Sequence, residues 1–179
     1  MCKNNKYLDI MIDIETLGTR NDSVITQIGA CYFNRDTGEI GDKCTLNVEI
    51  NSCLERGLTV TGGSIKFWLE RKENATFLKK PMSLTKALSY FGTFINKKLP
   101  IWSHATFDPI ILASAYQAVG QGVPYSYRNL RDIRTLVDLA GIKYKKDKNE
   151  DPKSHDALDD CIYQVGYCVE CFRALKDKQ

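Results

Sequence analysis

The chain has 179 residues, enough for one ordinary domain that buries most of its apolar surface without disulfides. Its composition, 43% hydrophobic and 26% charged, is that of a globular protein, and no apolar run approaches the ~20 residues that a membrane-spanning helix needs. A formal net charge of +3 is too small to indicate a nucleic-acid partner by itself.

The seven cysteines stand at irregular spacings without paired C-x-x-C knuckles, an odd set that argues against a disulfide framework. The first residues, MCKNNKYLDI, lack the apolar core of a secretory signal. We therefore expect a single domain over residues 1–179, located in the cytoplasm and not in a membrane. In a reducing compartment Cys31 and Cys161 serve as small core residues.

Three β-favouring runs open the chain, and turn residues separate them. The second connection contains Asp36-Thr37-Gly38, a turn signal that joins neighbouring strands into an antiparallel pair. The three runs are residues 7–14, 23–33 and 44–50. A short apolar run at residues 100–103 predicts a further, buried strand.

Helical spacing of apolar residues dominates the rest of the chain. In the third predicted helix Asp108 suits the N-cap, Pro109 the first turn and Gly120 the exit. The predicted helices are residues 64–71, 83–96, 107–120, 127–141 and 154–176. Three strands, then helices, one strand and more helices predict an α/β fold, a mixed sheet flanked by helices with no internal repeat.

The stretch MIDIETLG places Asp13 and Glu15 inside an otherwise apolar strand. Residues two apart on a strand point to the same face, so both carboxylates project side by side. Like charges that close resist ionisation unless a cation joins them. The flanking YLDIMID is apolar on both faces and indicates an interior strand. The pair therefore predicts a metal site, with a solvated face, a cap or an ion pair as the alternatives.

Two further acidic motifs lie where elements meet. Asp108 stands between a strand and a helix, and the carboxyl end of a strand is where open α/β sheets bind ligands. Its alternative role is the helix N-cap ahead of Pro109. The last helix begins with SHDALDD, in which His155 precedes three acids that also favour a helix N-terminus electrostatically. These acids are Asp156, Asp159 and Asp160.

The carboxylates and the imidazole form a coherent set for one chemistry. Hard oxygen ligands select Mg²⁺ or Mn²⁺, and His155 has an ordinary pKa near working pH, so it can take a proton from water. Two such ions stabilise the attacking and leaving oxygens of a phosphodiester. The residue types therefore point to metal-dependent hydrolysis of phosphodiester bonds.

These motifs, in this order, resemble the DEDDh family of 3′→5′ exonucleases in the ribonuclease H-like superfamily, which includes ribonuclease T, oligoribonuclease and proofreading exonucleases. The resemblance runs from about residue 7 to residue 172. The segments MIDIETLGT, SVITQIGACYF and RNLRDIRTLVDLAG look closest to a bacterial and phage branch described as exoribonuclease-like or exodeoxyribonuclease VIII-like. The resemblance implies a mixed five-stranded sheet with an antiparallel first portion, in a single exonuclease domain.

The resemblance also implies the roles of the site residues. Asp13 bridges two Mg²⁺ or Mn²⁺ ions, Glu15 and Asp160 complete one of them, and Asp108 holds the water shell of the second. His155 is the general base.

Some positions stay open. Helical angle alone does not choose between Asp159 and Asp160, so the choice of Asp160 rests on the family pattern. Many relatives have Asn where this chain has His104, which is either a hydrogen-bonded structural residue or a substrate ligand. Three more residues match the branch pattern without a role beyond ordering a helix: Asp132, Arg134 and Thr135.

Contacts to the 3′-terminal nucleotide are expected from the loop after the first strand. By resemblance, Leu17 would pack against the last base while the loop backbone reaches its sugar; a plain turn is the alternative. The aromatic pair in SIKFWLER offers a stacking surface or packs in the core. The candidate substrate-binding residues are Thr16, Leu17, Gly18, Phe67, Trp68 and His104.

We therefore expect a metal-dependent 3′→5′ exonuclease that releases nucleoside 5′-monophosphates from a single-stranded 3′ end, because a free terminus has to enter a pocket. RNA is preferred to DNA, although no residue announces a 2′-hydroxyl contact. The alternatives are a DNA-specific exonuclease and a catalytically silent nucleic-acid-binding or scaffold module, which the five filled catalytic positions disfavour. Relatives are often dimers, so a homodimer is a further expectation.

A zinc site of Cys161, Cys168 and Cys171 with His155 fails on spacing, since His155 lies roughly 20 Å from the later cysteines along one helix. The lysine-rich residues 143–153, KYKKDKNEDPK, predict a solvated loop. A second hypothesis is that this loop orders over the substrate and carries His155 into place.

Overall fold

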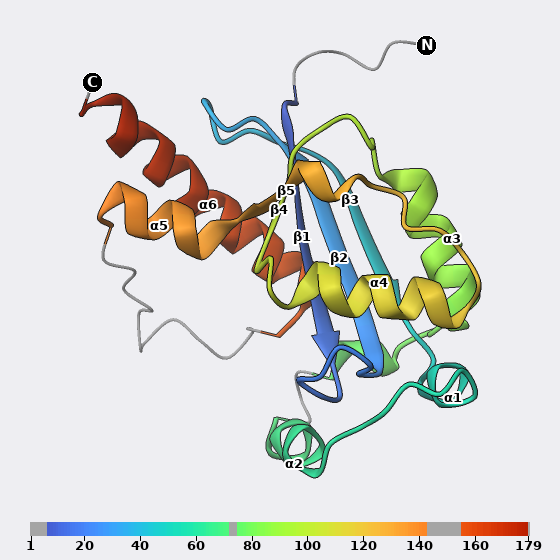
Figure 1. Ribbon diagram of the computed structural model, residues 1–179. Coiled ribbons are helices and arrows are strands. Elements are labelled where there is room, and N and C mark those ends of the chain that lie inside the picture. The colour runs from blue at the N-terminus through green and yellow to red at the C-terminus, as the bar shows by residue number, and fades with distance from the viewer. Residues whose placement is uncertain (1–6, 72–74, 143–154, 179) are drawn as a thin grey trace.

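The computed structural model describes residues 7–71, 75–142 and 155–178. Its strands form one sheet in the order β3-β2-β1-β4-β5 (Figure 1). The first three strands pair antiparallel, whereas β1, β4 and β5 run parallel. The strands are β1 (Asp9–Thr16), β2 (Ile25–Phe33), β3 (Ile40–Asn47), β4 (Ile101–Ser103) and β5 (Leu130–Asp132). The predicted mixed five-stranded sheet with an antiparallel first portion is confirmed.

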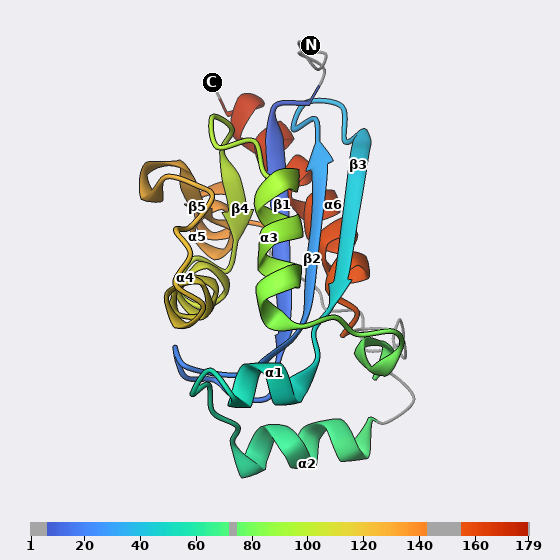
Figure 2. The ribbon, with the colours of Figure 1, turned by 90° about the vertical axis from the view of Figure 1, so that its right-hand side faces the viewer.

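Helices cover both faces of the sheet (Figures 1 and 2). Helices α3 and α4 pack on one face, and α5 and α6 pack on the other. The short helices α1 and α2 lie beyond the carboxyl end of β1. The helices are α1 (Ile50–Leu54), α2 (Gly62–Glu70), α3 (Leu84–Phe94), α4 (Asp108–Ala118), α5 (Ile133–Ala140) and α6 (Ala157–Lys176), with 3₁₀ turns η2 (Thr76–Leu78) and η3 (Tyr127–Asn129).

Strand β1 is buried on both faces, as its sequence predicts. Ile10, Ile12 and Ile14 point into the core under α3 and α4, whereas Met11 points into the core under α6. Because side chains alternate along a strand, Asp13 shares the face of Met11. The alternation therefore carries the carboxylates of β1 toward α6.

One predicted helix is wrong in its first part. Residues 127–141 fold as a 3₁₀ turn, then strand β5, and only then helix α5. The side chain of Asp132 accepts a hydrogen bond from the amide of Thr135 and so caps α5 at that point. Gly141 ends the helix in the left-handed conformation, with φ of 68°. Pairing of β5 with β4 outweighs the local helical spacing upstream of the cap.

The predicted third strand is also displaced. The run 44–50 is a strand only to Asn47, and β3 begins earlier, at Ile40. Ile50 instead starts α1, a short helix that the sequence did not reveal. Glu49 caps this helix, because its carboxylate accepts hydrogen bonds from the amides of Asn51 and Ser52.

Close packing at Gly29 brings α6 onto the sheet. A Cβ atom at this position of β2 would lie 2.3 Å from the backbone carbonyl of Ala157. Only glycine therefore allows the first turn of α6 to reach this depth. Gly29 pairs with Asp13 in the neighbouring strand, so the helix start lies next to the carboxylates of β1.

Cys31 and Cys161 are buried in the core, as predicted. Among the residues that the structure describes, no helix combines the length and hydropathy needed to cross a membrane. The lysine-rich residues 143–153, and with them the hypothesis of loop closure, lie outside the described part of the chain.

Candidate active site

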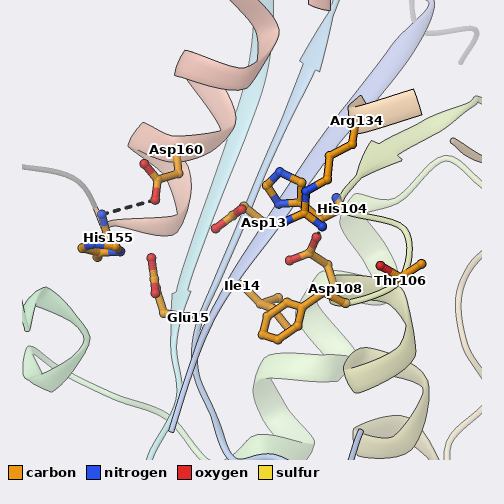
Figure 3. Close-up of a pocket in the computed structure, with 10 residues that line it drawn as sticks. Asp13, Ile14, Glu15, His104, Thr106, Asp108, Arg134, His155 and Asp160 are labelled. Atoms are coloured by element: carbon orange, nitrogen blue, oxygen red, sulfur yellow. Dashed lines mark hydrogen bonds between the residues drawn. The ribbon is translucent and has the colours of Figure 1, made fainter. Parts of the chain in front are cut away.

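A pocket of about 340 Å³ opens at the carboxyl end of β1 (Figure 3). It gathers side chains from β1, from the turn between β4 and α4, from the start of α5 and from the start of α6. All five predicted catalytic residues line it. The lining residues are Asp13, Ile14, Glu15, His104, Thr106, Phe107, Asp108, Arg134, His155 and Asp160.

Asp13 and Glu15 lie side by side in this pocket and are only 7% and 8% exposed. Burial raises the pKa of Glu15 to about 9, and the negative charges of Asp160 and Asp108 add to the shift. Burial, followed by the charges of Asp108, Glu15 and Asp160, raises the pKa of Asp13 well above its ordinary value. Among the described residues, no Lys or Arg forms an ion pair with either carboxylate. These acids therefore need a cation from outside the chain if both are to be ionised.

Asp108 enters the pocket from the first turn of α4 and is 1% exposed. The predicted alternative, a helix N-cap, is wrong, because Phe107 holds that position and no side chain caps the helix. The Asp108 carboxylate instead accepts a hydrogen bond from the amide of His104 at 2.8 Å. Burial raises its pKa to about 7, although backbone hydrogen bonds from His104 and Ile14 lower it.

The start of α6 supplies the remaining catalytic candidates. The amide of His155 donates to the carboxylate of Asp160 at 3.2 Å (Figure 3). His155 has a φ of 81°, a left-handed conformation that costs a non-glycine residue of the order of 1 kcal/mol or more and is typical of functional sites. Asp160 lines the pocket, whereas Asp159 is exposed and points elsewhere. The structure thus separates the two acids that helical angle left open.

A polar cluster holds the start of α6 against the sheet. Asp156 caps the helix and accepts a hydrogen bond from Thr76 of η2 at 2.8 Å. Gln27 of β2 donates to the same carboxylate and accepts from the amide of Ala157 at 2.7 Å. Because His155 immediately precedes this anchored turn, the cluster fixes the backbone from which the imidazole projects.

Gln164 holds Asp13 from the next turn of α6. Its amide nitrogen donates to the Asp13 carboxylate at 2.8 Å, and its side chain is buried. The sequence did not single out Gln164 or Gln27. Gln164 stands four residues after Asp160, on the same helix face, so that spacing was the available signal. A glutamine inside the apolar run of β2 was the signal for Gln27.

The carboxylates and histidines form two groups with the geometry for metal binding. Asp13, His104 and Asp108 form one group, and Glu15, His155 and Asp160 form the other. Within each group, one ligand atom per residue lies within 4.8 Å of the others. Buried oxygen donors of raised pKa are suitable ligands for hard divalent cations. The residues present therefore fit two Mg²⁺ or Mn²⁺ ions, with His104 as a candidate ligand that the sequence placed near the substrate.

The loop after β1 follows Glu15, and its residues Thr16, Leu17 and Gly18 are not among those that line the pocket. Thr16 donates to the carbonyl of Gly18 at 2.6 Å, and a register shift between β1 and β2 occurs at Glu15 and Thr16. Leu17 belongs to the core and is 8% exposed. A Cβ at Gly18 would lie 2.4 Å from the hydroxyl of Ser23, so a larger residue here requires the Ser23 side chain to shift. Contact between this loop and a nucleotide stays a prediction.

Aromatic residues of α2 surround the ring of His155. Phe67 and Trp68 contact the imidazole edge-to-face, with ring centroids 4.9 and 5.9 Å away. Trp68 also donates to the carbonyl of Thr16 at 3.0 Å and packs against Phe77. Trp68 is buried in the core, so of the two predicted stacking residues only the half-buried Phe67 presents surface.

A mixed sheet of this order, with four carboxylates and a histidine at the carboxyl end of its central strand, defines the class of the protein. It is the class of 3′–5′ exonucleases, and the arrangement is the one that the resemblance to DEDDh enzymes implies. The chain belongs to the family of 3′–5′ exoribonuclease Rv2179c-like domains, whose family model matches residues 8–172. No curated protein is significantly similar to the chain in sequence.

Solved structures share the fold at low sequence identity. E. coli exonuclease I in complex with a dT13 oligonucleotide is 14% identical with a TM-score of 0.67, over 90% of this chain and 40% of that one. Exonuclease X in complex with 5′-overhanging duplex DNA is 14% identical with a TM-score of 0.61, over 92% of this chain and 91% of that one. The chain thus spans about 40% of the length of exonuclease I.

Proposed function

We propose that the chain is a divalent-metal-dependent exonuclease that removes nucleoside 5′-monophosphates from the 3′ end of single-stranded nucleic acid, with RNA preferred to DNA. The observation that carries the proposal is the buried carboxylate cluster of Asp13, Glu15, Asp108 and Asp160. The cluster lines one pocket with the imidazole of His155, and no Lys or Arg of the described residues forms an ion pair with Asp13 or Glu15.

The carboxylates, His155 and their neighbours have distinct roles in this reaction. Asp13, Glu15, Asp108 and Asp160 would hold two Mg²⁺ or Mn²⁺ ions, which when bound supply an activated water and stabilise charge on the phosphate and the leaving oxygen. His155 takes the proton of the attacking water, and its backbone amide is held by Asp160. Gln164 orients Asp13. The loop formed by Thr16, Leu17 and Gly18 supports the terminal nucleotide.

The preference for RNA rests on the family, which is described as exoribonuclease. The similar exonuclease I and exonuclease X structures instead contain DNA. A protein distinguishes the two sugars by contacting the 2′-hydroxyl. We propose that the backbone of the loop after β1 makes this contact. A single 2′-deoxy substitution at the 3′-terminal nucleotide of an RNA would therefore lower kcat/KM more than the same change at the 5′ end.

The test uses 5′-labelled single-stranded RNA and DNA of one sequence with Mg²⁺ or Mn²⁺. We expect a ladder that shortens from the 3′ end, faster on RNA, and release of nucleoside 5′-monophosphates. Chelation by EDTA and the D13N variant should both abolish it. Internal cleavage, or a ladder indifferent to D13N, would contradict the proposal, and stable RNA binding without cleavage would favour the silent module.

The role of His155 is checked separately with H155A. Loss of a general base lowers kcat by about 10²–10⁴-fold. Metal affinity, measured by calorimetry, should fall much less if water activation is the main function of the imidazole. An unchanged kcat would remove His155 from the mechanism.

The homodimer stays a prediction, and light scattering after size exclusion measures it directly.

A further inference from the structure

Among the residues that the structure describes, Arg134 is the one Lys or Arg side chain that lines the pocket. It lies in the first turn of α5, and its side chain runs past the ring of His104 toward the carboxylate of Asp108 (Figure 3). The resemblance to the exonucleases gave this residue no function beyond ordering a helix. Its place in the pocket calls for a different explanation.

Neutralising the acids is not a sufficient role for Arg134. Its positive charge acts on Asp108, yet no ion pair or hydrogen bond joins its guanidinium to a carboxylate among the described residues. The Asp108 carboxylate is bonded to backbone amides instead. The five N–H donors of Arg134 are thus available, within the described part of the chain, to a ligand in the pocket.

Asp132 holds the first turn of α5 in position. Its carboxylate accepts hydrogen bonds from the amide and the hydroxyl of Thr135, at 2.9 and 2.7 Å. The same carboxylate accepts from the amide of Ala105 at 3.1 Å and so ties α5 to the turn that carries His104. Arg134 is therefore fixed relative to the pocket by its own backbone, while its side chain stays exposed.

The position of Arg134 opposite His155 indicates what it binds. In Figure 3 the group of Glu15, His155 and Asp160 lies on one side of Asp13, and Arg134 lies on the other. In-line hydrolysis places the attacking water and the leaving oxygen on opposite sides of the phosphorus. With His155 on the water side, Arg134 is on the side of the leaving oxygen. A guanidinium matches phosphate oxygens bidentately.

We infer that Arg134 binds the scissile phosphate, donating hydrogen bonds to its non-bridging oxygens from the leaving-group side, with Asp132 as the residue that positions it. This inference rests on the proposed exonuclease function and adds a phosphate-specific contact to it. The released nucleoside 5′-monophosphate keeps the same phosphate, so the contact persists in the product complex.

The experiment compares uridine 5′-monophosphate with uridine as ligands in the presence of Mg²⁺, since they differ only in the phosphate. Calorimetry and inhibition of RNA cleavage give both dissociation constants for the wild type and for R134Q. We expect R134Q to weaken binding of the monophosphate about 10- to 100-fold, as loss of hydrogen bonds to a charged group does. Binding of uridine should be unchanged. The dissociation constant of R134K for the monophosphate should lie between those of the wild type and R134Q. An ammonium keeps the positive charge but cannot donate two parallel hydrogen bonds as a guanidinium does.

The matched control is R131Q, which removes the same charge three residues away. Arg131 donates to the backbone carbonyls of Arg128 and Leu130 and does not line the pocket. It should leave both dissociation constants unchanged. Equal weakening of uridine and its monophosphate in R134Q, or no weakening of either, would overturn the inference. Failure of the wild type to shorten RNA would instead refute the proposed function.

Discussion

Each end of β1 buries a carboxylate on the same face of the sheet, but the partners that stabilise the two carboxylates differ. At the amino end, Asp9 accepts hydrogen bonds from the Arg35 guanidinium, one of them at 2.6 Å, and from the Trp102 indole at 2.8 Å. At the carboxyl end, Asp13 has the Gln164 amide but no ion pair in the described part of the chain. A buried acid with its own arginine belongs to the fold, whereas acids without one indicate a site for an external cation.

The largest difference between the two ends should appear in activity. D13N removes a metal ligand, and we expect kcat to fall about 10³-fold or more, since a bound metal supplies several kcal/mol of transition-state stabilisation. The same change removes a repelling charge, so thermal stability in EDTA at pH 8 should stay level or rise. Melting curves and single-turnover cleavage measure the two quantities. A strongly destabilised D13N would contradict the distinction.

D9N is the matched change at the other end. It replaces the charged acceptor of the partly exposed Arg35 and of the Trp102 indole by a neutral amide, and we expect a loss of about 1–3 kcal/mol of unfolding free energy. Activity per folded molecule should change little, because Asp9 is distant from the pocket. Urea unfolding followed by fluorescence gives the stability. If D9N were as stable as the wild type and yet lost as much activity as D13N, the two ends of β1 would not have separate functions.

A smaller loss is expected when the support of Asp13 is removed. Q164L deletes the hydrogen bond to Asp13 while keeping a side chain of similar volume. Outer contacts of this kind typically contribute 10- to 100-fold to metal affinity or activity. Titration with Mn²⁺ should show weaker activation. If Q164L gave the same Mn²⁺ titration curve as the wild type, Asp13 would keep its orientation without Gln164.

The pH dependence of stability should be confined to the metal-free protein. Glu15 has a pKa of about 9 and Asp108 of about 7, both raised from the ordinary carboxyl range by burial. The folded state then binds more protons than the unfolded state between pH ~4 and ~9, so its stability falls as the pH rises through this window. Melting curves in EDTA should show this decline, and Mn²⁺ should reverse it above pH 7. A flat profile in EDTA would contradict the raised pKa values of Glu15 and Asp108.

The sequence predicted the parts of the site that depend on short-range pattern. Alternation along β1 placed Asp13 and Glu15 on one face, and the element boundaries placed Asp108 and His155 at the ends of their elements. The choice of Asp160 needed the family pattern, because adjacent helix positions cannot be separated without knowing where the helix packs. The contacts of Gln164 and Gln27 were not predictable, since their partners lie 151 and 130 positions away in the chain.

The fold shows the same division. Strongly patterned elements such as β1, β2 and α3 were predicted closely, whereas β5 was read as helix. A three-residue strand has too little sequence for a period to show, and β5 exists because β4 offers an edge beside it. The cap formed by Asp132 and Thr135 was the available local signal for where the helix starts.

The glycine at position 29 has a consequence for how the enzyme matures. Asp13 lies near the start of the chain, and the residue that holds it follows 151 positions later on α6. A chain growing from the ribosome therefore carries half of a nuclease site until α6 emerges and seats against Gly29. A chain that has not yet made α6 therefore has Asp13 without Gln164 and a carboxylate pocket without Asp160.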